Sequence, residues 1–224
     1  MKGDRANMPS YQTELQPYGQ QPEMRIKRIV FPLLLLFWLF CLPLAFSIYT
    51  PYLYQTNCYW NERCERMGEE KTAQSINELT GFFLHHSNEL KRPWTIKENL
   101  HMREVRAIYD RVFIIFALIT LIFIIDLWFI PHAARRYSRY AANSLLISSC
   151  LAVLAIALIP FFSSFWMHIF HPLLFDNELW RTNPRDISWY LMPKAFFLRV
   201  IIFICVSTLL LNILLWWFGR PRKT

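Results

Sequence analysis

The sequence predicts an all-α membrane protein with four transmembrane helices and an extracytoplasmic cap formed by two outer segments. Three observations predict this class. The chain of 224 residues is 54% hydrophobic, which exceeds the content of an ordinary soluble domain. Its apolar residues gather into four stretches, each near the roughly 20 residues that a helix needs to cross a bilayer. Its basic residues are distributed unequally between the segments that join these stretches.

The four apolar stretches define the expected spans at residues 29–49, 111–130, 141–162 and 195–218. The first and third contain no charged residue, the apolar part of the second contains only Asp126, and the fourth contains only Arg199. Between the spans we expect a first cap segment at residues 50–110, a loop at 131–140 and a second cap segment at 163–194. Residues 1–28, rich in Gln, Pro and Tyr, are expected to be a disordered tail, and residues 219–224 a short second tail.

The charge distribution predicts the orientation in the membrane. The two tails and the loop together hold eleven Lys and Arg against three acids, whereas the two cap segments hold eleven against twelve. Cytoplasmic flanks of membrane proteins are enriched in Lys and Arg. We therefore expect a multi-pass protein of the plasma membrane with both termini in the cytoplasm and the cap on the outer face. This topology explains the net charge of +8 without nucleic acid as a partner.

Local patterns predict the helices of the cap. Apolar residues at helical spacing indicate an amphipathic helix from Glu69 to Leu84. Thr95 and Glu98 match a capping box, which begins a helix that we expect to continue into the second span. The second cap segment contains three prolines and is expected to be irregular, with short helical turns.

The five cysteines differ in their expected environments. Three lie within the spans, where a thiol is usually a small packing residue: Cys41, Cys150 and Cys205. Cys58 and Cys64 lie in the first cap segment with five residues between them, in a compartment that permits disulfides. A bridge between these two is compatible with the sequence but not required by it.

Two histidines lie where the cap segments meet the membrane, and they are the candidates for chemistry. His101 is on the helix that enters the second span, and His171 follows the third span. Glu98 and Glu104 flank His101 on the same helix face, where a carboxylate can hold one ring nitrogen and orient the other. The alternative is that His101 is an ordinary polar residue on a solvated helix.

Two other classes of function compete with acid–base catalysis. His168 and His171, completed by His101, could serve a metal-dependent membrane hydrolase, although a metal site normally needs three or four ligands. A non-enzymatic assembly or sensor subunit could use the cap as its docking face. The chain has no Gly-x-Ser-x-Gly elbow, so a serine nucleophile is poorly supported.

Two stretches carry a family resemblance. "HMREVR", from His101 to Arg106, resembles a His-Met-x-Asp-Val-Lys signature, and "FHPLLFDNELWRTNPRDISWYLMPKAFF", from Phe170 to Phe197, resembles a longer pattern with a Phe-His start and a Pro before Phe-Phe. Together they resemble the lipoprotein intramolecular transacylase family of bacterial membrane proteins. Glu104 and Arg106 replace the usual Asp and Lys with conservation of charge. Lys194 stands where an acid is common.

The resemblance implies a reaction and its residues. One acyl chain of a diacylated lipoprotein would move from the middle (sn-2) glyceryl ester to the α-amine of the N-terminal cysteine, and His101 and His171 would be the catalytic residues. The substrate lipoprotein and membrane lipid would be the partners, without a cofactor, a metal or an obligate protein partner. Four further residues are expected to bind or orient the substrate: Glu104, Arg106, Asn177 and Trp180. Among these, Asn177 or Arg106 could donate to the developing oxyanion.

Overall fold

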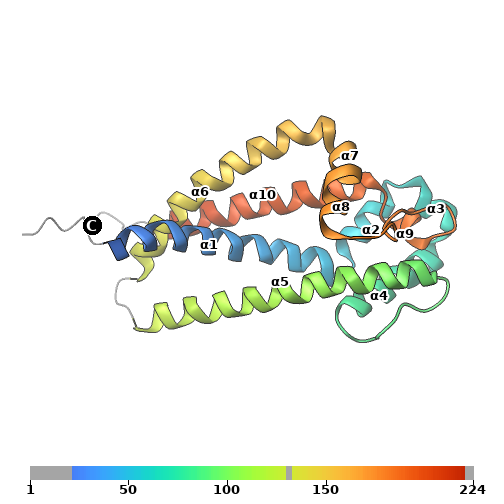
Figure 1. Ribbon diagram of the computed structural model, residues 1–224, viewed down its shortest axis with the longest axis horizontal. Coiled ribbons are helices and arrows are strands. Elements are labelled where there is room, and N and C mark those ends of the chain that lie inside the picture. Colours follow the sequence, from blue (N-terminus) through green and yellow to red (C-terminus); the bar gives the residue numbers. More distant parts are fainter. Residues whose placement is uncertain (1–21, 130–132, 220–224) are drawn as a thin grey trace, which may run out of the picture.

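The computed structural model describes residues 22–129 and 133–219, and in these residues it is helical without strands (Figure 1). Four of the described helices are long and apolar enough to cross a membrane. They are α1 (Pro22–Tyr49), α5 (Ile96–Phe129), α6 (Ala133–Leu158) and α10 (Lys194–Phe218). The predicted fold class is confirmed.

The helices extend beyond the stretches that hydropathy marks. α1 begins at Pro22 rather than at residue 29, and α6 begins at Ala133 rather than at residue 141. Hydropathy identifies only the part of a helix that lipid must surround, and a helix continues past that part wherever nothing breaks it. The remaining residues of the predicted tails and loop, at 1–21, 131–132 and 220–224, lie outside the described residues, as does residue 130 at the end of the predicted second span.

α5 shows the same effect most clearly, because it has 34 residues and is about 51 Å long at about 1.5 Å per residue. A bilayer core of about 30 Å accounts for little more than half of this length. The part that precedes Val112 is rich in charged residues, and it carries the helix into the cap, as predicted.

The spans form a loosely packed bundle. α10 packs against α6 and α1, and α5 packs against α1. The buried contacts near the cap-distal end are apolar and come from α1, α5 and α6: Leu35, Leu39, Ile119, Phe123, Tyr137 and Ala141. Most apolar side chains of α5 point outward instead, including Ile114, Leu118, Leu121 and Ile125. Such an apolar exterior is stable in lipid, where it needs no protein partner.

The cap gathers at one end of the bundle, opposite the described C-terminal end (Figure 1). Its first segment forms α2 (Tyr52–Tyr59), α3 (Glu62–Met67) and α4 (Glu69–Phe83). η1 (Ile159–Phe161) lies at the end of the predicted third span, and the second segment then forms α7 (Phe162–Phe165), η2 (Trp166–Phe170), α8 (His171–Leu174) and α9 (Ile187–Leu191). α4 confirms the predicted amphipathic helix, since its apolar face, with Ile76 and Leu79, is buried in the core of the cap.

The two cap segments are joined by hydrogen bonds from side chains to backbone. Three residues of the first segment donate to carbonyls of α9: Asn57 to Leu191 at 3.1 Å, Asn61 to Tyr190 at 2.7 Å and Arg63 to Trp189 at 3.0 Å. Cys58 and Cys64 form a disulfide between α2 and α3, which resolves the alternative that the sequence left open. The cap is therefore one unit rather than two separate loops.

Candidate active site

The first candidate histidine is positioned by the start of α5. The predicted capping box forms, because the backbone N–H and the hydroxyl of Thr95 each donate to Glu98 Oε2 at 2.9 Å. The backbone N–H of Glu98 donates in return to Thr95 Oγ1 at 3.3 Å. These bonds satisfy donors that the first helical turn leaves free. His101 follows in the second turn and is 8% exposed.

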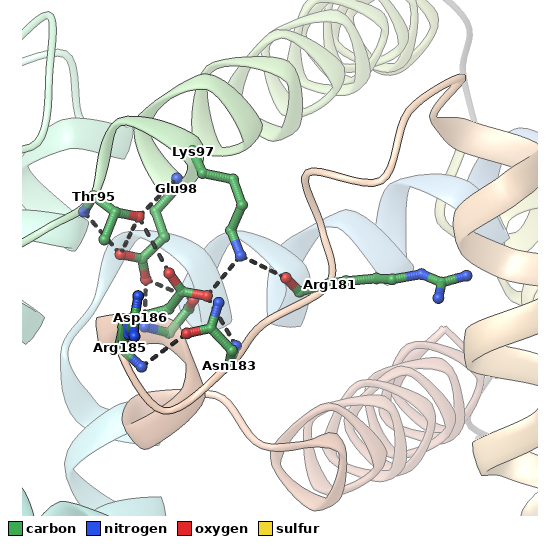
Figure 2. A network of polar contacts seen from close by, with 8 residues as sticks. Thr95, Lys97, Glu98, Arg181, Asn183, Arg185 and Asp186 are labelled. Atoms are coloured by element: carbon green, nitrogen blue, oxygen red, sulfur yellow. Dashed lines mark hydrogen bonds and ion pairs between the residues drawn. The ribbon is translucent and has the colours of Figure 1, made fainter.

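A buried polar network fixes this first turn of α5 to the second cap segment (Figure 2). The other carboxylate oxygen of Glu98 accepts from the backbone N–H of Ser188 at 2.7 Å and from its hydroxyl at 2.6 Å. The ammonium of Lys97 donates to Asp186 at 2.7 Å and to the carbonyl of Arg181 at 2.7 Å. Glu98 and Asp186 are each only 2% exposed, and both carboxylates have donors. Glu98 therefore joins the two segments instead of orienting the imidazole.

The second candidate histidine is positioned by a π-helical turn. After α6 the chain turns through η1 and α7 into η2, and His171 begins α8. The carbonyl of Trp166 accepts the backbone N–H of His171 and lies 2.7 Å from Nδ1 of the same imidazole. A carbonyl only accepts, so Nδ1 carries the proton and Nε2 is the free nitrogen of the neutral ring. His171 is 7% exposed.

The two imidazoles converge, although seventy positions separate them in the sequence. Their ring centroids are 6.4 Å apart. Phe175 contacts both rings, with centroid distances of 4.8 Å to His101 and 5.9 Å to His171. Trp180 stacks on His171 at 4.4 Å, and Trp166 meets it edge-on at 4.7 Å. Aromatic rings therefore hold both imidazoles where the cap meets the bundle.

A chain of polar contacts also connects the two histidines. Glu104 Oε2 lies 3.6 Å from His101 Nδ1, beyond hydrogen-bond distance, and both atoms are buried without a partner among the described residues. The other oxygen of Glu104 accepts from Asn177 Nδ2 at 2.8 Å. The carbonyl of Asn177 accepts the indole N–H of Trp180 at 2.8 Å, and that indole stacks on His171. One asparagine thus contacts the neighbours of both imidazoles.

Two cavities meet at the histidine pair. The smaller, of about 200 Å³, has mainly apolar walls from α1, α5 and α10, including Leu44, Ile48, Val105, Phe196 and Val200. Tyr54 also lines it, and burial raises the pKa of this phenol, which therefore stays protonated. The larger, of about 610 Å³, lies in the cap and is the more polar of the two, with Arg63, Arg181, Thr182 and Lys194 among its lining residues. Both imidazoles line both cavities.

Two predicted residues lie away from this pair. The guanidinium of Arg106 donates to the carbonyls of Phe82 at 3.0 Å and Ser87 at 2.9 Å and lies over the Phe82 ring, so it fixes the end of α4. It lines neither cavity. His168 is exposed and also lines neither cavity. Among the described residues no three His, Cys, Asp or Glu side chains are grouped as metal ligands, so the set proposed for a hydrolase is not assembled.

Sequence reasoning missed three contributions to the site. It gave no role to the Trp166 carbonyl, to Asp186 or to Arg63. Asp186 lies inside the longer of the two quoted stretches and is one of only three acids in the second cap segment, which is the signal that could have drawn attention to it. A backbone carbonyl and a distant arginine leave no comparable signal in the sequence.

Four apolar helices with two buried, facing imidazoles at the edge of the cap define an integral membrane protein with a candidate active site where the cap meets the bundle. The family model described as lipoprotein intramolecular transacylase Lit matches residues 29–197. This chain belongs to that family. It is therefore an acyltransferase and a multi-pass membrane protein.

Solved structures share the fold. The membrane-integral lipoprotein intramolecular transacylase Lit from Bacillus cereus aligns with a TM-score of 0.72 and 20% identity, over 88% of this chain and 95% of that one. A variant of it with a histidine replaced by arginine gives 0.71 and 18%, over 88% and 90%. A variant with a histidine replaced by alanine gives 0.72 and 20%, over 88% and 91%. No curated protein is significantly similar in sequence.

Proposed function

We propose that this chain moves one acyl chain within a diacylated lipoprotein, from the middle (sn-2) glyceryl ester to the α-amine of the lipidated N-terminal cysteine. The observation that carries the proposal is the pair of buried imidazoles, 6.4 Å apart, between an apolar and a polar cavity. Membership of the transacylase family supports the reaction class. With the cap on the outer face and both termini in the cytoplasm, the site lies where the lipid anchor of an exported protein would reach it.

The protein has to supply only acid–base catalysis, in which it removes one proton and delivers another. The amine nitrogen forms a bond to the ester carbonyl carbon, and the bond from that carbon to the glyceryl oxygen breaks. One proton leaves the nitrogen and one reaches the glyceryl oxygen, so the products are an amide and a free hydroxyl. The substrate supplies the nucleophile. The enzyme therefore has to deprotonate an amine with a reference pKa of about 7.7–8.0 and protonate the leaving oxygen.

The two imidazoles can divide these tasks. Burial lowers the pKa of both imidazoles below the ordinary value of about 6.5, that of His101 to about 4, so both rings are neutral in mildly alkaline solution and can accept a proton. His171 has Nδ1 bound to a carbonyl, so Nε2 is its free acceptor. His101 lies beside Glu104, whose charge stabilises the imidazolium that proton transfer creates. We assign Glu104, Asn177 and Trp180 to orienting the two rings, because they connect one ring to the other.

The reaction also requires that the amine and the ester be held close together, and the two cavities can meet this requirement. Amine and ester lie several bonds apart in one molecule, and the chain must fold back before the nitrogen reaches the carbonyl. Holding reacting groups together can contribute up to about 7–11 kcal/mol. The apolar cavity and the surrounding lipid hold hydrocarbon, whereas the polar cavity accepts the peptide side of the substrate.

Replacing His101 or His171 by alanine tests the proposal. We expect either change to abolish conversion of a synthetic diacylated lipopeptide by purified protein in bicelles, because each ring would carry a proton. The transfer leaves the mass unchanged, so the product is identified by chromatography and by fragment ions that place the acyl chain on nitrogen. His168→Ala is the matched control, since His168 is exposed and outside both cavities. Full conversion by either of the first two variants would refute the proposal.

A further inference from the structure

The polar cavity, which we call the mouth, has more cationic than acidic residues in its lining. It lies between α3, the loop before α9 and the start of α10, and its cationic residues are Arg63, Arg181 and Lys194. Among the described residues, Glu98 is the one acid in its wall, and both of its carboxylate oxygens already accept hydrogen bonds. The lining of the mouth therefore carries a positive potential.

Two of the three cations lack an acidic partner. Arg181 is ion-paired with Glu178, and its charge is largely compensated. The guanidinium of Arg63 lies 3.8 Å above the centroid of the Trp189 ring, and Lys194 donates to the hydroxyl of Ser163 at 3.0 Å. Within residues 22–129 and 133–219, neither Arg63 nor Lys194 forms an ion pair. Both keep donors for an incoming anion.

The mouth is also the place where the peptide of the substrate has to pass. In the reaction proposed above, the α-amine of the lipidated cysteine lies at the two imidazoles, and the next residue begins at the same cysteine. The apolar cavity offers few donors for a polar backbone, whereas the mouth adjoins both imidazoles and adds charged and hydroxyl side chains. Unpaired polar backbone is costly in apolar surroundings, so the chain leaves through the mouth.

We propose that the mouth binds the first residues after the lipidated cysteine and that Arg63 and Lys194 favour acidic side chains there over basic ones. The inference rests on the proposed acyl transfer. It makes these two cations specificity-determining residues of this enzyme. An exposed ion pair changes affinity by at most about fivefold. If the contributions of Arg63 and Lys194 add, we expect an acidic peptide to be preferred over a basic one by about tenfold.

The test compares diacylated lipopeptides that differ only at the four residues after the cysteine, which are Asp-rich, Ser-rich or Lys-rich. Conversion by purified full-length protein is measured as kcat/KM in zwitterionic bicelles at low salt. We expect the Asp-rich peptide to exceed the Lys-rich peptide by about tenfold, and salt to reduce the difference. Lys194→Gln should reduce the preference and Lys194→Glu should abolish it, because the new carboxylate offsets the remaining charge of Arg63. Lys71→Glu on the exposed face of α4 is the matched control and should change nothing.

Three results would overturn the inference. The first is equal conversion of the three peptides by the wild type, and the second is a preference that Lys194→Glu leaves intact. The third is a rate that does not depend on peptide charge but rises with anionic phospholipid in a manner that depends on Lys194, since the cations would then bind lipid phosphate. Failure of the acyl-transfer proposal looks different, because His101→Ala would then remain active on every peptide.

Discussion

Replacing Glu104 by glutamine isolates the electrostatic role that we assign to this carboxylate. Glutamine has the same shape, and its amide oxygen can still accept from Asn177 Nδ2, which now donates to Glu104 Oε1 at 2.8 Å. What disappears is one negative charge at 3.6 Å from His101 Nδ1. The contacts of Asn177 with the loop and with Trp180 involve other atoms and should persist.

The size of the effect follows from that distance. At the observed 3.6 Å, two unit charges attract by about 4.6 kcal/mol with an effective dielectric constant of about 20 and by about 1.2 kcal/mol in bulk water. The Glu104 side chain is 37% exposed, so solvent screens part of the attraction. We expect a loss of about 1–3 kcal/mol in stabilising the imidazolium. At about 1.36 kcal/mol for each factor of ten, kcat falls by roughly five- to 150-fold.

The assay is conversion of a diacylated lipopeptide under saturating substrate, with thermal unfolding measured on the same preparations. Glu104→Asp, which keeps the charge at a greater distance, should lose less activity than Glu104→Gln. Glu89→Gln is the matched control, because Glu89 is an exposed carboxylate that pairs with Arg103 of α5 away from the imidazoles. An unchanged kcat in Glu104→Gln, with normal folding, would show that this carboxylate does not assist His101.

Three further predictions concern the surroundings of the pair. Trp180→Phe keeps a ring against His171 but loses the indole N–H donor, so kcat should fall several-fold. Trp180→Ala removes the ring as well and should lose more activity. Equal losses in the two variants would mean that stacking is irrelevant. Asp186→Asn leaves Lys97 without its carboxylate, so the free energy of unfolding should drop by about 1–3 kcal/mol and calorimetry should give a lower Tm. An unaltered Tm would argue against the network of Figure 2 as a stabilising element. Activity should survive a chelator and His168→Ala, whereas loss in both would revive the metal-dependent hydrolase.

Much of the architecture was predictable because it depends on local or bulk properties. Apolar length alone identifies the four spans, since the backbone in lipid must be hydrogen-bonded within each segment. The capping box at Thr95 and the amphipathic face of α4 are short-range patterns with a known geometry. The convergence of the two imidazoles was predictable too, because each lies at the junction of a span with the cap.

The parts that could not be predicted depend on contacts between segments distant in the sequence. Glu98 flanks His101 on the helix, yet it bonds to Ser188, ninety positions away, and only the fold decides between those partners. Arg106 lies in the "HMREVR" stretch, but the end of α4 and the loop after it supply the carbonyls that hold it. Spacing in a single helix gives the face of a residue, not the element packed against that face.

The π-helical turn η2 also sets how this enzyme can change by insertion and deletion. In this turn the backbone N–H of His171 bonds to a carbonyl five positions earlier, whereas an α-helix would use the carbonyl four positions earlier. Removing one residue between Trp166 and Phe170 would therefore convert the turn into an ordinary α-helix while leaving His171 beside the carbonyl of Trp166. Homologous chains can be expected to differ by one residue in this stretch and still present the imidazole to the same partner.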